Sequence, residues 1–259
     1  MAAARARRRR KPPRKLSRAQ RLALSPRPPA GAILAGRIAA ARIANAFEAS
    51  IRKALAGKLD TFALRRSDAT EEASEAALDA VSFKPATYYP STGGVAAKSL
   101  KHSEAEFKRV GIKVEKEPDT AKVLTAWRKK SAKRAASILE REKATIIELL
   151  AGSENRTPEQ LQERLEERFV VTKSKLEAAS KDDILTLNGQ ITQVRQEAAG
   201  IEEFYWTTAG ENRVRESHAE IDGEVFRWDD PPIVDGEEAI PGQPPNCRCV
   251  ATPRLPELE

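Results

Sequence analysis

His218, Cys247 and Cys249 carry the side chains of this sequence that are best suited to chemistry. Both cysteines of the chain lie here, separated by one residue, and His218 is one of two histidines. In an extended segment, side chains two residues apart point to the same side, so both sulfurs can face one ion. Zinc prefers thiolate and imidazole ligands in a tetrahedral arrangement, which requires a fourth ligand. The residues therefore suggest a zinc site with Asp222, Glu220 or water in the fourth position.

Three other interpretations use the same residues. In the first, the cysteines are small buried apolar side chains and His218 hydrogen-bonds a loop carbonyl. In the second, Cys247 or Cys249 is a thiolate nucleophile with His218 as its base. In the third, a zinc hydrolase uses Glu216 or Glu220 as its base. The sequence has no phosphate-binding loop, serine nucleophile motif or recognisable catalytic carboxylate pair, so we do not expect an enzyme.

Three arginines near the cluster are expected to have structural roles: Arg213, Arg215 and Arg248. A guanidinium group can bind two backbone carbonyls or a carboxylate and so hold an irregular loop against a neighbouring element. The acidic residues around them disfavour phosphate binding: Asp229, Asp230, Asp235, Glu237 and Glu238.

A strand and a turn are expected to position this region. In residues 204–207, Phe and Trp alternate with Tyr and Thr, which is typical of a half-buried strand. The pair Asp222-Gly223 predicts a tight β-turn of type I′. The proline- and glycine-rich residues 231–245 predict an irregular loop.

The middle of the chain predicts long amphipathic helices. A helix over 33–59 is indicated by apolar residues that recur near four-residue steps: Leu34, Ile38, Phe47, Ile51, Leu55 and Leu59. A second helical block is expected over 120–150. A third helix starts at Thr157-Pro158, where Gln160 completes a capping box. A further helix over 174–199 is expected to end at Gly200.

The N-terminal segment is strongly basic. Thirteen Lys or Arg precede the first acidic residue, Glu48, whereas residues 48–259 carry 32 basic and 38 acidic side chains. Residues 1–30 combine like charges with five prolines, which predicts a disordered arm. Such an arm binds nucleic-acid phosphates without sequence preference, or it only increases solubility. The candidate nucleic-acid-binding residues are Arg7, Arg8, Arg9, Arg10, Lys11, Arg14 and Lys15.

The expected fold class is α+β. A disordered arm over 1–30 precedes an elongated, mainly helical region over 31–144, and a small α+β module follows over 145–259. No run of about 18 apolar residues is present, so no membrane partner is expected. Two cysteines one residue apart do not form a disulfide framework, and a reducing compartment is expected.

The C-terminal pattern resembles the phage Mu F-like minor head proteins, also called phage head morphogenesis proteins. The resemblance covers roughly 145–255 and rests on these residues: Ile184 to Gln190, Gly200, Trp206-Thr207-Thr208, Arg213-Val214-Arg215, His218, Asp222-Gly223, Pro244-Pro245 and Asn246-Cys247-Arg248-Cys249. Within it, Trp206, Gly223 and Asn246 are expected to have structural roles alongside the arginines. Some relatives carry a Cys-x-x-Cys pair where this chain has Arg215 and His218. Arg215 replaces the first of these potential ligands and His218 offers a third ligand, so the resemblance leaves zinc as an open hypothesis.

The resemblance implies a structural protein of the bacteriophage virion. Members are few-copy proteins of the capsid interior that associate with the portal protein and act in head assembly and in DNA packaging or delivery. The implied partners are the portal protein, packaged double-stranded DNA and the capsid or scaffold proteins. The implied locations are the virion and, during assembly, the host cytoplasm. The alternative is a non-specific nucleic-acid-binding protein with a zinc- or thiol-stabilised module that belongs to no particle.

Overall fold

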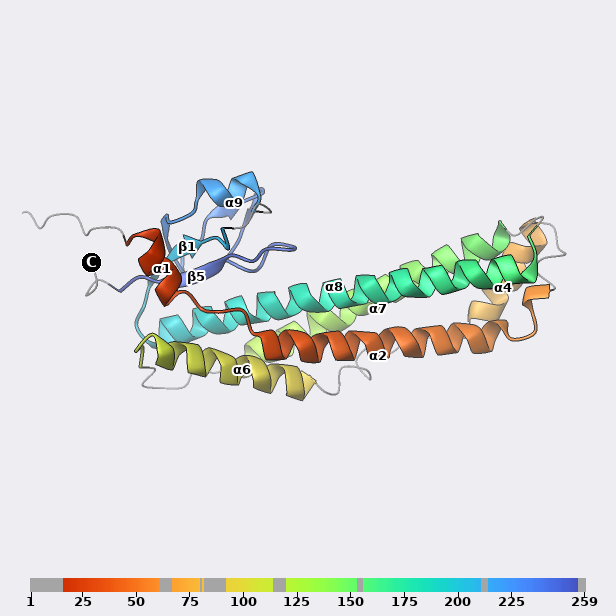
Figure 1. Ribbon diagram of the computed structural model, residues 1–259, viewed down its shortest axis with the longest axis horizontal. Coiled ribbons are helices and arrows are strands. Elements are labelled where there is room, and N and C mark those ends of the chain that lie inside the picture. The colour runs from red at the N-terminus through yellow and green to blue at the C-terminus, as the bar shows by residue number, and fades with distance from the viewer. Residues whose placement is uncertain are drawn as a thin grey trace, which may run out of the picture.

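A long helical rod with a small module at one end makes up the computed structural model, which describes residues 16–60, 67–79, 81, 92–113, 120–152, 156–210 and 214–255 (Figure 1). The described helices are α1 (Arg18–Leu24), α2 (Ala30–Leu55), α4 (Ser67–Asp79), α6 (Thr92–Arg109), α7 (Ala121–Ala151), α8 (Pro158–Ala198) and α9 (Glu216–Glu220). The described strands are β1 (Glu203–Thr207), β2 (Val225–Arg227), β3 (Ile233–Val234), β4 (Glu237–Glu238) and β5 (Val250–Pro253). The predicted α+β class, with long helices before a small C-terminal module, is confirmed.

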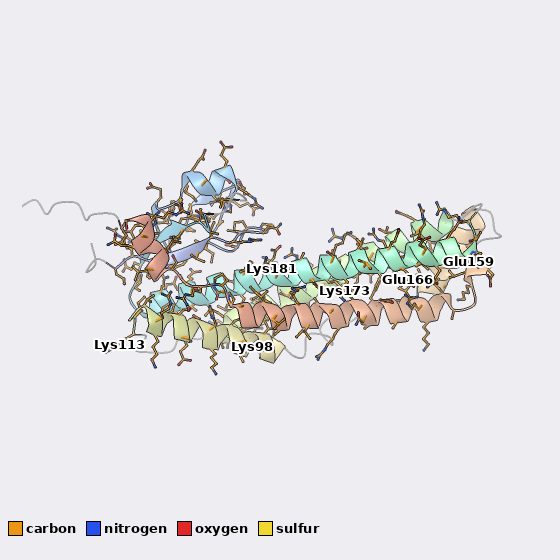
Figure 2. All side chains as sticks on the ribbon, viewed as in Figure 1. Lys98, Lys113, Glu159, Glu166, Lys173 and Lys181 are labelled. Carbon is orange, nitrogen blue, oxygen red and sulfur yellow. The ribbon has the colours of Figure 1, made fainter. Side chains whose placement is uncertain are left out.

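Helix α8 is the axis of the rod. Its 41 residues extend about 60 Å at 1.5 Å per residue. It runs antiparallel to α2, because Arg37 pairs with Glu177 and Arg52 pairs with Glu166. Charged side chains project from the rod along its length (Figure 2). The rod therefore has an apolar interior and a charged surface.

Local signals set both ends of α8. The Thr157 side chain accepts from the Gln160 backbone N–H, and the Gln160 side chain accepts from the Thr157 N–H, which is the predicted capping box. At the other end Gly200 adopts a φ of 75°, and Ile201 N–H donates to the Gln196 carbonyl. Between these ends the chain is one continuous helix. The separate helix expected over 174–199 is therefore the second half of α8.

The buried face of α2 differs from the predicted one. Phe47, Ile51 and Leu55 are buried as expected, but Leu34 is 59% exposed and Ile38 is 49% exposed. In this half of the helix the face toward α8 consists of small residues: Ala32, Gly36, Ala39, Ala40 and Ala44. Small residues allow two helices to approach closely. The contact with α8 thus overrides the preference of the larger side chains for burial.

A buried carboxylate, Glu142, links α7 to α8 inside the rod. Its side chain is 2% exposed and lies 2.6 Å from Arg168, 2.7 Å from Lys175 and 3.2 Å from the Thr172 hydroxyl. Burial alone would raise the pKa of Glu142. The hydrogen bond from Lys175 and the charge of Arg168 outweigh it, so the pKa lies below the ordinary value of 4.5.

The Glu142→Gln variant is expected to be less stable than the wild type at neutral pH by about 1–2 kcal/mol. The effect is smaller than for a fully buried pair because the Lys175 side chain is 50% exposed. A carboxyl group with a lowered folded pKa stabilises the protein above its ordinary pKa, and this stabilisation is lost as the pH falls below 4.5. The difference between the two proteins should therefore shrink in acid.

Denaturant unfolding at neutral pH and at about pH 3.5 measures this difference. Glu140, on the same helix, pairs with Lys143 at the surface, and Glu140→Gln is the matched control with little expected effect. A difference between wild type and Glu142→Gln that is unchanged in acid would contradict the prediction.

The module contains a three-stranded antiparallel sheet in the order β2-β1-β5 and a β3-β4 hairpin. The predicted strand at 204–207 is confirmed as β1, but its expected half-burial is wrong. Phe204 and Trp206 face a core with Trp228 and Ile240, and the opposite face of β1 is buried as well. The sheet therefore lies between two layers.

Part of the second layer comes from the segment predicted to be a disordered arm. Residues 16–30 are ordered: Ser17 caps α1 with a capping box, and α1 packs on β1 and β5 (Figure 1). The Ser25 hydroxyl lies 2.5 Å from that of Thr252, which is 2.8 Å from the Thr207 hydroxyl. The expected disorder over 1–30 is thus wrong for 16–30, because this segment covers a sheet face. Residues 1–15 lie outside the described residues.

Arg21 fixes α1 to the module. Its guanidinium donates to the Leu16 carbonyl at 3.1 Å and to the Asp222 carboxylate at 3.3 Å, and the residue is 9% exposed. We expect Arg21→Ala to lower the free energy of unfolding by about 1.5 kcal/mol, because a hydrogen-bonded ion pair is lost. The amides of 16–25 should then exchange faster with solvent. The exposed Leu22 on the same helix provides the control Leu22→Ala, and equal exchange in both variants would contradict this role of Arg21.

The boundary expected between residues 144 and 145 lies inside α7, which is continuous from Ala121 to Ala151. Both α7 and α2 pack along α8, which leads directly into β1.

No helix of the described residues has the length and hydrophobicity needed to cross a bilayer.

Candidate functional site

Two separate segments bring the candidate ligands together. His218 lies on the short helix α9, and Cys247 and Cys249 lie in the loop before β5. The loop turns at Asn246, which has a φ of 57°, and Cys247 N–H donates to the Pro244 carbonyl at 3.0 Å. Asparagine tolerates this left-handed conformation better than most residues. The turn directs the Cys247 side chain into the module.

The three side chains form a compact buried cluster. His218 Nδ1 lies 3.6 Å from Cys247 Sγ and 3.4 Å from Cys249 Sγ. The exposed fractions are 2% for His218, 5% for Cys247 and 6% for Cys249. The Trp206 ring meets the imidazole edge-on, with 5.5 Å between ring centroids. The structure thus brings together all three residues that the sequence singled out.

The surroundings shift the pKa values of the two thiols in opposite directions. The Cys249 thiol donates to Cys247, and the backbone N–H groups of Cys249 and Gly242 add to this bond, which lowers the pKa of Cys247. The same bond, burial and the adjacent negative charge raise the pKa of Cys249. The pocket therefore favours one thiolate beside an imidazole.

A carboxylate lies behind the imidazole. His218 Nε2 is 3.8 Å from Asp235 Oδ2 and is buried without a hydrogen-bond partner. Asp235 accepts from Arg215 at 3.0 Å and from the Ser217 hydroxyl at 2.8 Å. The Ser217 bond and the charge of Arg215 hold the pKa of Asp235 below its usual value. Arg215 also donates to the Pro245 carbonyl at 2.6 Å, so it links α9 to two loops as a structural arginine would.

This chemistry permits two uses of the cluster. A thiophilic metal ion fits two sulfurs and an imidazole, and a thiolate with an adjacent imidazole fits a nucleophile. Burial of both sulfurs restricts access for a substrate. The geometry is better suited to holding the loop against α9 than to turnover.

Residues 142–252 match the family model described as Phage Mu protein F like protein. This segment belongs to the phage Mu F-like family. The match confirms the resemblance seen over roughly 145–255. The Mu F-like segment begins inside α7 and includes α8, β1, the buried cluster and most of β5. The family pattern therefore covers the end of α7, all of α8 and most of the strand-containing module, but not α1.

One similar protein is an uncharacterized protein of Haemophilus influenzae. It is 41% identical over 80 residues, which is 31% of this chain and 17% of that protein. The chain therefore spans less than two thirds of the length of this relative. No solved structure matches the chain.

The Asp222-Gly223 turn of the Mu F-like segment ties α9 to the sheet and to α1. It follows α9 directly and does not close a hairpin between two strands, and of the pair only Gly223 has a positive φ, 82°. Type I′ needs positive φ at both positions, so that expectation is wrong. Gly223 N–H donates to the Trp206 carbonyl at 2.7 Å, and a Cβ on Gly223 would lie 2.6 Å from the Arg21 guanidinium. The turn therefore requires glycine beside Arg21.

The suggested fourth ligands lie outside the cluster. The Asp222 carboxylate accepts from Thr208 N–H at 2.9 Å and from Arg21, and Glu220 is exposed. Among the described residues, His218, Cys247 and Cys249 form the group suited to a metal, with no fourth Cys, His or carboxylate. Sequence patterns did not reveal Asp235 as a contact of His218. Its one signal was an acidic residue beside a glycine in the loop.

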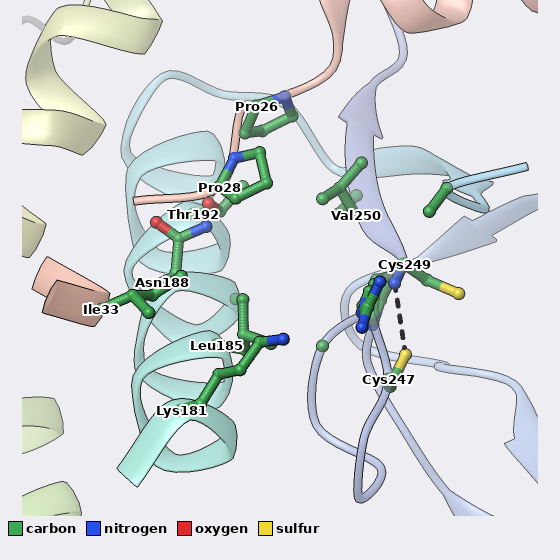
Figure 3. A pocket seen from close by; sticks show the side chains of 16 residues that line it. Pro26, Pro28, Ile33, Lys181, Leu185, Asn188, Thr192, Cys247, Cys249 and Val250 are labelled. Atoms are coloured by element: carbon green, nitrogen blue, oxygen red, sulfur yellow. Dashed lines mark hydrogen bonds between the residues drawn. The ribbon is translucent and has the colours of Figure 1, made fainter. Parts of the chain in front are cut away.

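The cysteine loop borders two cavities. One, of about 310 Å³, lies between this loop, α8 and the start of α2 and includes Pro26, Asn188 and Thr192 in its wall (Figure 3). The other, of about 280 Å³, lies on the side of Arg215, His218 and Asn246. Both sulfur-bearing residues line both cavities.

The remaining predicted site residues fall into two groups. Trp206 is fully buried in the module core, and Arg248 is exposed on the cysteine loop, where it lines both cavities. Arg213 and the basic residues of the arm lie outside the described residues: Arg7, Arg8, Arg9, Arg10, Lys11, Arg14 and Lys15. Their expected contacts with nucleic acid stay predictions.

Proposed function

We propose that the protein is a structural component of a bacteriophage head that acts in head morphogenesis. The observation that carries this proposal is the Mu F-like segment, which spans α8 and the module. A rod about 60 Å long with a charged surface and a compact end module suits a protein that docks on a larger assembly. The buried cluster then serves the fold of the module.

We further propose that the protein lies in the capsid interior and associates with the portal, with capsid or scaffold proteins as neighbours. Packaged DNA is a dense array of phosphates, and residues 1–15 carry eight Lys or Arg without an acidic residue. A basic arm beside this array neutralises phosphates without sequence preference. The arm therefore suits a role in packaging or delivery of the DNA.

Mass spectrometry of purified particles and procapsids, with a pull-down on the portal protein, tests the proposal. We expect the protein in particles at low copy number and in complex with the portal. Its absence from both particles and procapsids would overturn the proposal. A free nucleic-acid-binding protein is the alternative, and it predicts DNA binding without particle association.

A matched pair of variants tests the arm. In one, Arg7 to Arg10 are changed to Gln, and in the other the same is done to four rod lysines labelled in Figure 2: Lys98, Lys113, Lys173 and Lys181. Each lost phosphate contact reduces the slope of log affinity against log salt by about 0.9, so the arm variant should lose about 3–4 from the slope. An equal loss in both variants would show that the arm has no special role.

A further inference from the structure

The cluster of His218, Cys247 and Cys249 has the dimensions of a metal site. The candidate ligand atoms all lie within 4.8 Å of one another. A tetrahedral zinc ion with Zn–S of about 2.3 Å and Zn–N of about 2.05 Å requires N···S separations of about 3.5–3.6 Å. The observed separations are 3.6 Å and 3.4 Å, both from His218 Nδ1. We propose that His218 Nδ1, Cys247 Sγ and Cys249 Sγ bind one zinc ion.

The surroundings of His218 supply a second, independent feature of a metal site. A metal at Nδ1 places the imidazole proton on Nε2, and metal-bound histidines donate this proton to a carboxylate or carbonyl. Nε2 is buried, has no hydrogen-bond partner and lies 3.8 Å from Asp235 Oδ2. Arg215 and Ser217 hold that carboxylate in place. Asp235 is therefore the carboxylate positioned to receive the Nε2 proton.

The backbone near the sulfurs suits a negative ligand. Cys249 N–H points at Cys247 Sγ at 3.4 Å, and this bond is drawn in Figure 3. A backbone N–H that donates to sulfur stabilises the thiolate, which is the form that binds metal. Exposure of 6% or less for all three residues excludes most solvent, which strengthens the attraction between ion and ligands.

All three proposed ligand residues line the cavity of about 280 Å³ beside Arg215 and Asn246, so this cavity offers space for a fourth ligand. Within the described residues no further Cys, His or carboxylate reaches the cluster, so water takes this position. The ion links α9 to the loop before β5, two segments about 30 residues apart, and so acts as a structural cross-link of the module. Metal binding by such a site contributes directly to folding.

The test uses the full chain, produced with zinc in the medium and purified without chelator. Elemental analysis should find about one zinc ion per chain, and zinc removal should lower the melting temperature. Cobalt(II) in place of zinc should give the visible absorption of a tetrahedral ion and an ultraviolet band from thiolate-to-cobalt charge transfer. A chain without zinc and without these cobalt bands would overturn the proposal.

Variants separate ligands from residues that only support the fold. Cys247→Ser, Cys249→Ser and His218→Gln should each lose zinc. His102→Gln should retain it, because His102 lies on α6 and hydrogen-bonds the Arg27 carbonyl. Phe226→Ala perturbs the core beside Phe204 and controls for general destabilisation. It should lower the melting temperature and keep zinc. Loss of zinc in both control variants, or retention in all three ligand variants, would contradict the assignment.

Asp235→Asn tests the positioning role of the carboxylate. Loss of such a partner weakens metal binding by about 10–100-fold, with the coordination unchanged. We therefore expect a lower zinc affinity in a chelator competition and a cobalt spectrum like that of the wild type. A zinc affinity equal to that of the wild type would show that Asp235 does not support metal binding.

Discussion

Trp206→Ala is expected to unfold the C-terminal module while the rod stays helical. Trp206 is fully buried on the central strand, packs in the core with Phe204 and Trp228, and meets the His218 ring edge-on. Truncation of a buried tryptophan costs about 3–5 kcal/mol, since apolar contacts are lost and a cavity remains. The module has one small core, so it has few other contacts to compensate.

Hydrogen exchange measured by mass spectrometry locates the effect. In Trp206→Ala, peptides from β1, β2 and β5 should lose protection, whereas peptides from the middle of α8 should keep it. Trp127 is the matched control: it is 5% exposed, and its indole N–H donates to the Asp183 carbonyl at 2.8 Å inside the rod. In Trp127→Ala, peptides from α8 should lose protection, whereas peptides from β1, β2 and β5 should keep it. Unchanged protection of β1 and β5 in Trp206→Ala would contradict the prediction.

Gly189→Val is expected to separate the module from the rod. Gly189 lies on α8 where the backbone of the loop 241–242 touches the helix, and a Cβ here would lie 2.6 Å from the Pro241 carbonyl oxygen. The obstacle is backbone, which cannot rotate away as a side chain can. The neighbouring bond from the Thr186 hydroxyl to the Gly242 carbonyl, 3.3 Å long, should break as well. We expect a loss of about 3 kcal/mol, at the upper end for overpacking.

Gly31→Ala is the matched control for this substitution. Gly31 lies near the start of α2 with nothing within 4 Å of the added Cβ, so alanine should be neutral or stabilise the helix by up to about 1 kcal/mol. Thermal unfolding gives the change in stability, and exchange of the 239–251 amides reports the contact with α8. The stability of Gly189→Ala should lie between that of Gly31→Ala and that of Gly189→Val. A Gly189→Val protein as stable as the wild type would show that the loop can move away from α8 without cost.

The sequence predicted those features that neighbouring residues determine. Thr157, Pro158 and Gln160 act within one turn, so the start of α8 could be located from three residues. Gly200 ends the same helix through its own backbone conformation. The aromatic alternation in 204–207 marked β1, and the two cysteines faced a common site because they are two residues apart.

Features that depend on distant segments required the tertiary structure. Burial of Gly36 in place of Leu34 follows from the close contact of α2 with α8, which no pattern within α2 encodes. Residues 16–30 look disordered by composition, yet they fold because the second face of the sheet offers them a surface to cover.

The candidate site likewise has features that the sequence predicted and features that required the tertiary structure. By itself the sequence determined which side chains can bind a metal, because thiol and imidazole chemistry belongs to the residues His218, Cys247 and Cys249. Only the tertiary structure decided that α9 meets the cysteine loop, that Asp235 lies behind the imidazole, and that Asp222 binds Arg21 instead. The physical reason is that these contacts form between elements positioned by packing on α8 and β1, and packing partners are not encoded in local spacing.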